Sequence, residues 1–206
     1  MPRGCDAVIV IPTLDPIRAA YVAKEARDRA GIPCGLVIAS DFAKRGAVRV
    51  SNVLVRAAID WDAKYVCYLN DDVGDFPDGW LKRLIEAVEL KDVYGSASAG
   101  GKCRGGPQAS CRPGMPPGVL EAELPLAWFC TVIKRRVFEQ IGYFDERMIH
   151  YCDETDFETR MSEQGWLNIY VQDVWVRHDA GQPIREWWDR DHTMLRKKWG
   201  HDKRFF

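Results

Sequence analysis

The sequence lacks long apolar runs, a strong net charge and paired cysteines. No stretch approaches the length of a membrane span, and the apolar run 7–11 is too short for the core of a signal peptide. The formal net charge of -1 gives no general attraction to nucleic acid or to an anionic membrane. These absences predict a cytoplasmic globular protein in which any charged site is local.

The 7 cysteines are odd in number and include no Cys-x-x-Cys pair. Cys67 and Cys130 lie in apolar runs, where a thiol behaves as a small hydrophobic group, so we expect reduced thiols. Cys103 and Cys111 are an alternative zinc or disulfide pair, but no second pair follows at zinc spacing. With 206 residues, 47% of them hydrophobic, and no linker or internal repeat, the chain is expected to form one domain over residues 1–206.

Short apolar strands alternate with helices in the first third of the chain. Residues 7–12, 34–39 and 65–69 are apolar runs of strand length, and the segments 16–29 and 50–61 between them have helical spacing. This alternation predicts an α/β fold with a parallel sheet and right-handed crossovers. Such sheets bind ligands at the carboxyl ends of their strands.

Polar side chains follow each of these strands. Thr13 and Asp41 follow the first two, and Asn70, Asp71 and Asp72 follow the third. Adjacent carboxylates repel each other unless a cation lies beside them, and Mg²⁺ or Mn²⁺ with oxygen ligands fits that need. All of these residues are also common in turns and helix caps, which is the alternative interpretation of each one alone.

The rest of the chain is less regular. Asp78 is expected to cap a helix over 80–88, and a strand is expected over 92–98. The stretch 100–118, crowded with Gly and Pro, is a candidate lid or acceptor-side loop. The remaining predicted elements are a strand over 120–134, a helix over 135–141, a helix over 152–164 with acids in its first turn, and strands over 167–171 and 174–176. We therefore expect antiparallel strands to extend the sheet.

The segment from Arg185 onward is basic and contains Trp187, Trp188 and Trp199. Basic residues interleaved with aromatic residues can bind a single nucleic-acid strand. The favoured interpretation is a closing amphipathic helix that packs its tryptophans on the domain.

Seven motifs follow one another along the chain. They are Val8-Ile9-Val10-Ile11-Pro12-Thr13, Ser40-Asp41, Asn52, Leu69-Asn70-Asp71-Asp72-Val73, Val137 to Glu146, Asp153-Glu154-Thr155-Asp156 with Arg160, and Val176-Arg177-His178. In order and spacing they resemble the family 2 glycosyltransferases, over about residues 7–181. The resemblance implies a single α/β domain of GT-A type, with a Rossmann-like parallel sheet extended by antiparallel strands and helices on both faces. It divides the chain into a nucleotide-binding half (about 1–98), an acceptor and catalytic half (about 119–181) and a C-terminal helix and tail (185–206).

The resemblance also implies which residues bind the donor and the metal. The residues implied in nucleotide-sugar binding are Pro12, Thr13, Asp41, Asn52, Asn70 and Asp71, with Trp128 shaping the sugar pocket. Asp72 is the implied ligand of a divalent metal, Mn²⁺ or Mg²⁺. His178 matches a histidine that completes the metal site in such enzymes, and its alternative role is that of a hydrogen-bonded imidazole at a strand end.

The pair Asp153-Glu154 occupies the place of the family's Glu-Asp pair, whose second member is the catalytic base. This position implies Glu154 as the base. The order of the two acids is reversed here, so Asp153 and Asp156 are alternative bases. Acidic neighbours raise the pKa of Glu154 and a helix N-terminus lowers it, so the sequence does not give the direction of the shift.

Together these features predict a metal-dependent, inverting glycosyltransferase that moves a sugar from a nucleotide diphosphate sugar, with a UDP-sugar favoured, to an acceptor hydroxyl. The acceptor is a glycan, a lipid-linked saccharide, a small molecule or a nucleic acid. One alternative is a nucleotidyltransferase-like enzyme, but Pro12-Thr13-Leu14-Asp15 lacks the glycine and the basic residue of a phosphate loop. Another is a non-catalytic module that binds a nucleotide sugar or nucleic acid.

Overall fold

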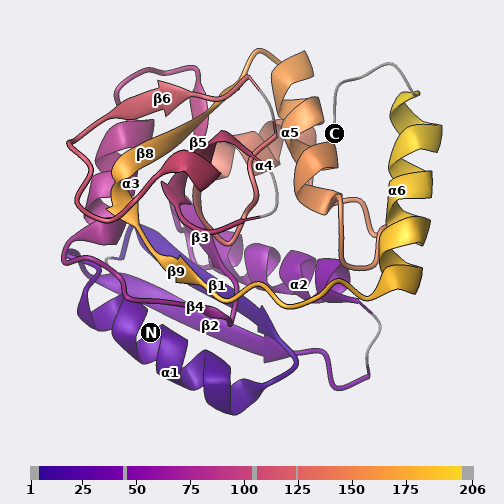
Figure 1. Cartoon of the computed structure of the whole chain (residues 1–206), viewed down its shortest axis with the longest axis horizontal. Coiled ribbons are helices and arrows are strands. Elements are labelled where there is room, and N and C mark those ends of the chain that lie inside the picture. Colours follow the sequence, from indigo (N-terminus) through magenta and orange to yellow (C-terminus); the bar gives the residue numbers. More distant parts are fainter. Residues whose placement is uncertain (1–4, 44–45, 104–105, 124, 201–206) are drawn as a thin grey trace.

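The computed structural model of the chain describes residues 5–43, 46–103, 106–123 and 125–200 (Figure 1). Seven strands form one sheet in the order β2-β1-β3-β7-β5-β8-β6. In chain order they are β1 (Ala7–Thr13), β2 (Cys34–Ser40), β3 (Tyr65–Leu69), β5 (Tyr94–Gly100), β6 (Val119–Glu121), β7 (Cys130–Lys134) and β8 (Leu167–Trp175). The predicted tail at 201–206 lies outside the described residues.

The strand directions confirm the predicted mixed sheet. β1 is parallel to both β2 and β3, and β5 is parallel to β8. β7 runs antiparallel between β3 and β5, and β6 runs antiparallel to β8 at the edge. Because β1, β2 and β3 run in the same direction, the polar residues that follow them emerge at one edge of the sheet.

Helices cover both faces of the sheet, as predicted. They are α1 (Pro16–Asp28), α2 (Ala47–Asp60), α3 (Trp80–Val88), α4 (Arg135–Ile141), α5 (Asp153–Glu163) and α6 (Arg185–Trp199). Side chains of β1 alternate between the two faces. Ala7, Ile9 and Ile11 share a core cluster with α1 and α3, whereas Val8 and Val10 share a second cluster with α2, α4 and α5.

The starts of α1 and α3 have different causes. Asp15 is the N-cap of α1, accepting two backbone N–H groups of the first turn, and Pro16 occupies the first helical position, as predicted. The predicted cap of α3 was wrong. Gly79 is its N-cap, with a φ of 76°, while the exposed Asp78 pairs with Arg29. A left-handed backbone favours glycine, so this helix start depends on backbone conformation rather than on a side-chain acceptor.

Two predicted strand ranges differ from the structure, and two short strands were not predicted. Residues 120–134 form two strands, β6 and β7, because residues 125–129 lie outside the sheet and begin with Pro125, which has no N–H to donate. Residues 167–175 form one strand rather than two. The two-residue strands β4 (Val73–Gly74) and β9 (Arg177–His178) pair in a second sheet, and elements this short have no periodicity to detect.

The described part of the stretch 100–118 packs against the domain. It contains the short 3-10 helix η1 (Pro107–Ser110), and the buried Cys111 follows it. Residues 104 and 105 of this stretch lie outside the described residues, and its role as a lid stays a prediction. All seven cysteines lie within the described residues and form no disulfide, so the alternative disulfide between Cys103 and Cys111 does not form. Within the described ranges, no helix combines the length and the apolar character needed to cross a bilayer.

Candidate active site

A cavity of about 440 Å³ lies at the carboxyl ends of β1, β2 and β3. Asn52 and Asp156, two of the twelve predicted site residues, are absent from its lining. The other ten line it, namely Pro12, Thr13, Asp41, Asn70, Asp71, Asp72, Trp128, Asp153, Glu154 and His178. The strand-end side chains therefore converge as the parallel arrangement predicts.

One side of the cavity, the strand-end wall, consists of Thr13, Arg18, Asp41, Asp71 and Asp72. The Thr13 hydroxyl donates to Asp71, whose other carboxylate oxygen accepts from the Arg18 guanidinium at 2.6 Å. Asp41 accepts the backbone N–H of Gly46 at 2.7 Å. Hydrogen bonds to fixed partners thus orient both carboxylates.

Asp72 and His178 meet because β4 pairs with β9. In that pairing Val73 lies opposite His178, and the Asp179 N–H donates to the carbonyl oxygen of Asp72 at 2.9 Å. His178 Nε2 lies 3.4 Å from Asp72 Oδ1. Burial acts to raise the pKa of Asp72, but the contact with His178 and the charge of Arg18 outweigh it, so this pKa lies below its ordinary value.

The donor set at this pair fits a hard divalent cation. His178 Nδ1 lies 3.0 Å from the carbonyl oxygen of Lys102, which can only accept, so Nδ1 carries a proton and Nε2 faces Asp72. Asp72 Oδ1 is buried with no hydrogen-bond partner among the described residues. In those same ranges, no three His, Cys, Asp or Glu side chains are grouped to hold a metal. A cation here would therefore take its remaining ligands from phosphate oxygens and water, as Mg²⁺ commonly does.

A second group of lining residues, the helix wall, consists of His150, Tyr151, Asp153, Glu154, Trp187 and Trp188. Asp153 and Glu154 are the first two residues of α5. Burial, followed by the charge of Glu154, raises the pKa of Asp153 well above its ordinary value. Burial also raises the pKa of Glu154, although its hydrogen bond from Asp153 opposes that rise. The structure thus supplies the direction that the sequence left open.

The interaction between the two acids acts in opposite directions on their pKa values. A hydrogen bond from Asp153 to Glu154 favours the protonated form of the first and the ionised form of the second. Asp153 is also buried, at 8% exposure, whereas Glu154 is partly exposed. Burial thus raises the pKa of both acids, which lie side by side and titrate as a pair.

Trp128 is held in the cavity lining by a buried carboxylate. Its Nε1 donates to Glu158 Oε1 at 2.5 Å, and Glu158 Oε2 accepts the Leu126 N–H at 2.8 Å. Glu158 lies one helical turn after Glu154 on α5. The irregular segment before β7 is thereby tied to the helix that carries the acid pair.

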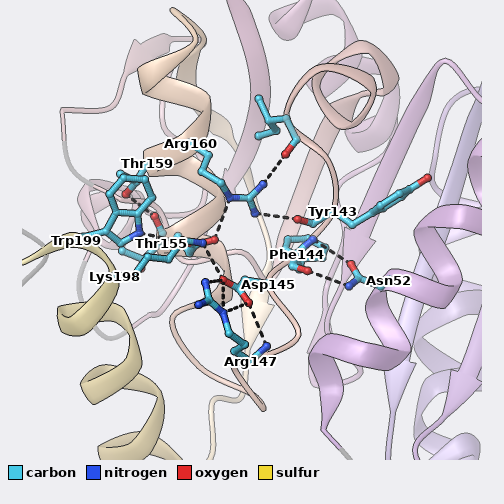
Figure 2. A network of polar contacts seen from close by, with 12 residues as sticks. Asn52, Tyr143, Phe144, Asp145, Arg147, Thr155, Thr159, Arg160, Lys198 and Trp199 are labelled. Carbon is cyan, nitrogen blue, oxygen red and sulfur yellow. Dashed lines mark hydrogen bonds and ion pairs between the residues drawn. The ribbon is translucent and has the colours of Figure 1, made fainter.

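Asn52 and Asp156 make structural contacts and do not line the cavity, and Figure 2 shows the contacts of Asn52 with Phe144. Asn52 on α2 accepts the Phe144 N–H and donates to the Phe144 carbonyl, both at 3.0 Å. Asp156 is fully buried and pairs with Arg160 at 3.0 Å and with Lys198 at 2.7 Å. Neither side chain lines the cavity. We therefore assign Asn52 no contact with the donor and do not assign Asp156 the role of base.

The sequence did not identify several residues of the lining. Arg18 lies in the first turn of α1, where only its distance from the strand end could have suggested a role. Trp187 and Trp188 pack on His150 and Tyr151, as expected for a closing helix, but their place in the cavity lining was not predicted. No local pattern marks a helix residue as facing a cavity formed by segments far away in sequence.

No protein-family model matches the sequence. A segment of 60 residues is 37% identical to the N-acetylglucosaminyl-diphospho-decaprenol L-rhamnosyltransferase of Mycobacterium tuberculosis, in two strains. This segment makes up 28% of the chain and covers 20% of the relative. The chain thus matches only about a fifth of the length of these curated relatives.

Solved structures share the fold at low sequence identity. GalNAc-T7 with UDP, GalNAc and Mn²⁺ aligns with a TM-score of 0.65 and 10% identity, over 86% of this chain and 44% of that one. TarS of S. aureus aligns with a TM-score of 0.62 and 10% identity, over 96% and 72%. The mannosyltransferase of Pyrobaculum calidifontis, in complex with GDP-Man and Mn²⁺, aligns with a TM-score of 0.61 and 14% identity, over 97% and 66%.

Proposed function

We propose, from the premise that the chain has the GT-A fold of glycosyltransferases, that it transfers a sugar from a nucleotide diphosphate sugar to an acceptor hydroxyl with inversion. The observation that carries the proposal is the cavity itself. It brings the Asp72–His178 pair and the Asp153–Glu154 pair, which are far apart in sequence, into one space. One pair suits a cation beside a diphosphate, and the other suits proton transfer.

The strand-end wall would bind the donor. Pro12, Thr13 and Asp41 would contact the base and ribose, and Asp71, held by Thr13 and Arg18, would contact the ribose or the sugar. Asp72 and His178 would hold Mn²⁺ or Mg²⁺, which would neutralise the negative charge that develops on the leaving diphosphate. A UDP-sugar is the favoured donor.

The helix wall would bind the acceptor and remove its proton. Glu154 would accept the proton of the acceptor hydroxyl as that oxygen attacks the anomeric carbon. The attack would come from the face opposite the leaving diphosphate, so the configuration inverts in one displacement. Trp128, Trp187 and Trp188 would exclude water from this side.

A thermal-shift panel tests donor binding. UDP-, GDP- and dTDP-sugars are added with and without Mn²⁺, and a ligand that binds the folded protein raises its melting temperature by mass action. We expect the largest shift with a UDP-sugar plus Mn²⁺, and loss of the Mn²⁺-dependent part in Asp72→Asn. The matched control is Asp78→Asn, at an exposed acid that pairs only with Arg29 among the described residues.

Product analysis then tests the reaction. Mass spectrometry of the reaction with the donor that binds, and an acceptor panel, is expected to show an acceptor gaining one sugar and releasing the nucleoside diphosphate. Transfer of a nucleotide, with release of pyrophosphate, would contradict the proposal. The proposal would also be contradicted if no donor in the panel raised the melting temperature, with or without Mn²⁺.

A further inference from the structure

Asp191 is a buried acid that binds backbone far from its own helix. It lies on α6 with 0% exposure. Its carboxylate accepts the backbone N–H groups of Ile149, His150 and Tyr151 at distances of 2.8 to 3.0 Å. One side chain thus satisfies three consecutive donors about 40 residues earlier in the chain. Hydrogen bonds from N–H groups to an ionised acceptor are among the strongest in proteins.

The three N–H groups belong to the segment that presents the acid pair. Residues 149–151 have no helix or strand of their own and lead directly into α5. His150 and Tyr151 line the cavity, and Asp153 and Glu154 follow two residues later. The position of this segment therefore decides where α5 begins and where its first two carboxyl groups point.

The connection between this segment and α5 has an unfavourable backbone conformation. Cys152, the N-cap of α5, has a φ of 64°, in the left-handed region that a residue with a Cβ rarely adopts. Its side chain makes no capping hydrogen bond. Such a conformation persists only where surrounding contacts fix the backbone on both sides. Asp191 supplies those contacts on the N-terminal side.

A second contact places α6 on the same segment. The Ile184 N–H, at the start of α6, donates to the Tyr151 hydroxyl at 2.9 Å, and the rings of Tyr151 and Trp188 lie 5.3 Å apart. His192, next to Asp191, lies 3.4 Å from the Cys152 sulfur. Contacts from Ile184, Trp188 and His192 therefore hold α6 against the segment before α5.

We propose that Asp191 is a positioning residue that fixes residues 149–152 so that Glu154 faces the acceptor hydroxyl. This inference rests on the proposed function, because Glu154 is the base only if the protein is a transferase. Asp191 itself does not line the cavity. Its effect on catalysis is exerted through the backbone and through its charge.

The charge of Asp191 also acts on the acid pair. It raises the pKa of both Asp153 and Glu154, after burial as the main cause. The other titratable groups that act on the pair are Tyr68 from β3, Cys152 before α5 and Glu158 from α5, and His192 from α6 contacts Cys152 beside them. Replacing Asp191 by a neutral residue is therefore expected to lower the pKa of Glu154 and to shift the acid limb of the pH profile of kcat to lower pH.

Two variants separate the two effects. Asp191→Ala removes both the acceptor oxygens and the charge, and we expect kcat to fall about 100-fold with the donor KM unchanged, because a small displacement of a catalytic group has an effect of that size. Asp191→Asn keeps one acceptor oxygen and loses the charge, so we expect a smaller fall in kcat together with the shift of the acid limb. The matched control is Asp189→Ala, at an exposed acid two residues earlier that pairs with Arg185. It is expected to leave kcat and the pH profile unchanged.

Amide hydrogen exchange tests the anchoring without any substrate. We expect the amides of residues 149–151 to be protected in the wild type and in Asp189→Ala, and to exchange much faster in Asp191→Ala. Where the alanine variant does not fold, the asparagine variant supplies both readouts. Unchanged protection at 149–151, or a wild-type kcat and pH profile in an Asp191 variant, would overturn the inference. A wild type that transfers no sugar would instead overturn the proposed function, and the exchange data would still decide whether Asp191 holds the segment.

Discussion

The two walls of the cavity are fixed by different kinds of contact. In the strand-end wall, Thr13 and the acids lie at the ends of β1, β2 and β3, whose pairing fixes their positions, and only Arg18 comes from a helix. In the helix wall, the acids stand at the start of α5, after a segment with no regular structure. Side chains from distant helices hold that region, including Asn52 on α2 and Asp191 on α6. Sheet pairing therefore positions the proposed donor site, and long-range bonds to backbone position the proposed base.

The largest expected effect is on catalysis at the helix wall. Glu154→Gln removes the proposed proton acceptor while keeping the size of the side chain, so we expect kcat to fall about 100- to 10,000-fold. The dissociation constant for UDP in the presence of Mn²⁺ should not change, because we propose that UDP contacts the strand-end wall. Steady-state kinetics and isothermal titration calorimetry measure the two quantities. Normal turnover in this variant would show that Glu154 is not the base.

The next effect is on stability, at the buried ion pairs that join α5 to α6. Asp156→Asn removes the fully buried carboxylate that Arg160 and Lys198 share and leaves Lys198 paired with Asp145, and we expect the free energy of unfolding to fall by about 3–5 kcal/mol. Urea unfolding measures the change. Asp28→Asn is the matched control, because that exposed acid pairs with Lys24 on the surface of α1, and it should change stability far less. Equal effects of the two substitutions would contradict the structural role given to Asp156.

A smaller loss of stability is expected at the contact between α2 and the turn before α5 (Figure 2). Asn52→Ala leaves the buried N–H and carbonyl groups of Phe144 without partners, which should lower the free energy of unfolding by about 2 kcal/mol. Ser51→Ala, at the neighbouring residue of α2, keeps those bonds and is expected to change stability less. If the Asn52 variant were as stable as the wild type and lost donor binding instead, Asn52 would belong to the donor site after all.

The smallest effect depends on pH. The pKa of Asp153 is raised in the folded protein, so its burial favours folding while the acid is protonated and this contribution is lost as pH rises toward the folded pKa. Asp153→Asn replaces the acid by a side chain that does not ionise, so the variant does not lose this stability as pH rises. We expect the variant to be more stable than the wild type at pH 8 and equally stable at pH 4, near the pKa of an unfolded aspartate. Thermal melts at both pH values measure the difference, and a variant that is less stable at pH 8 would contradict the raised pKa.

The comparison of the walls also explains what the sequence could predict. The apolar runs of β1, β2 and β3 predicted the parallel strands, and the strand order placed Thr13, Asp41 and Asp72 at one edge. These inferences need only local periodicity and the general geometry of parallel sheets. The cap of α1 by Asp15 is equally local.

The rest depended on contacts that leave no local pattern. Asp191 is one acid among several on a charged helix, and its partners are backbone groups about 40 residues away. The pairing of β4 with β9, which brings His178 to Asp72, involves two residues from each strand. The motif order suggested that these two side chains would meet, but no periodicity could have shown how.

We propose that the cavity binds a nucleoside diphosphate through a cation held at the strand-end wall, while Glu154 of the helix wall serves as the base. The most direct test is isothermal titration of UDP, with and without Mn²⁺, into the wild type, Asp72→Asn and Glu154→Gln. We expect Mn²⁺-dependent binding of UDP that Asp72→Asn abolishes and Glu154→Gln preserves. Binding that is equal in the presence and absence of Mn²⁺, or that survives unchanged in Asp72→Asn, would contradict it.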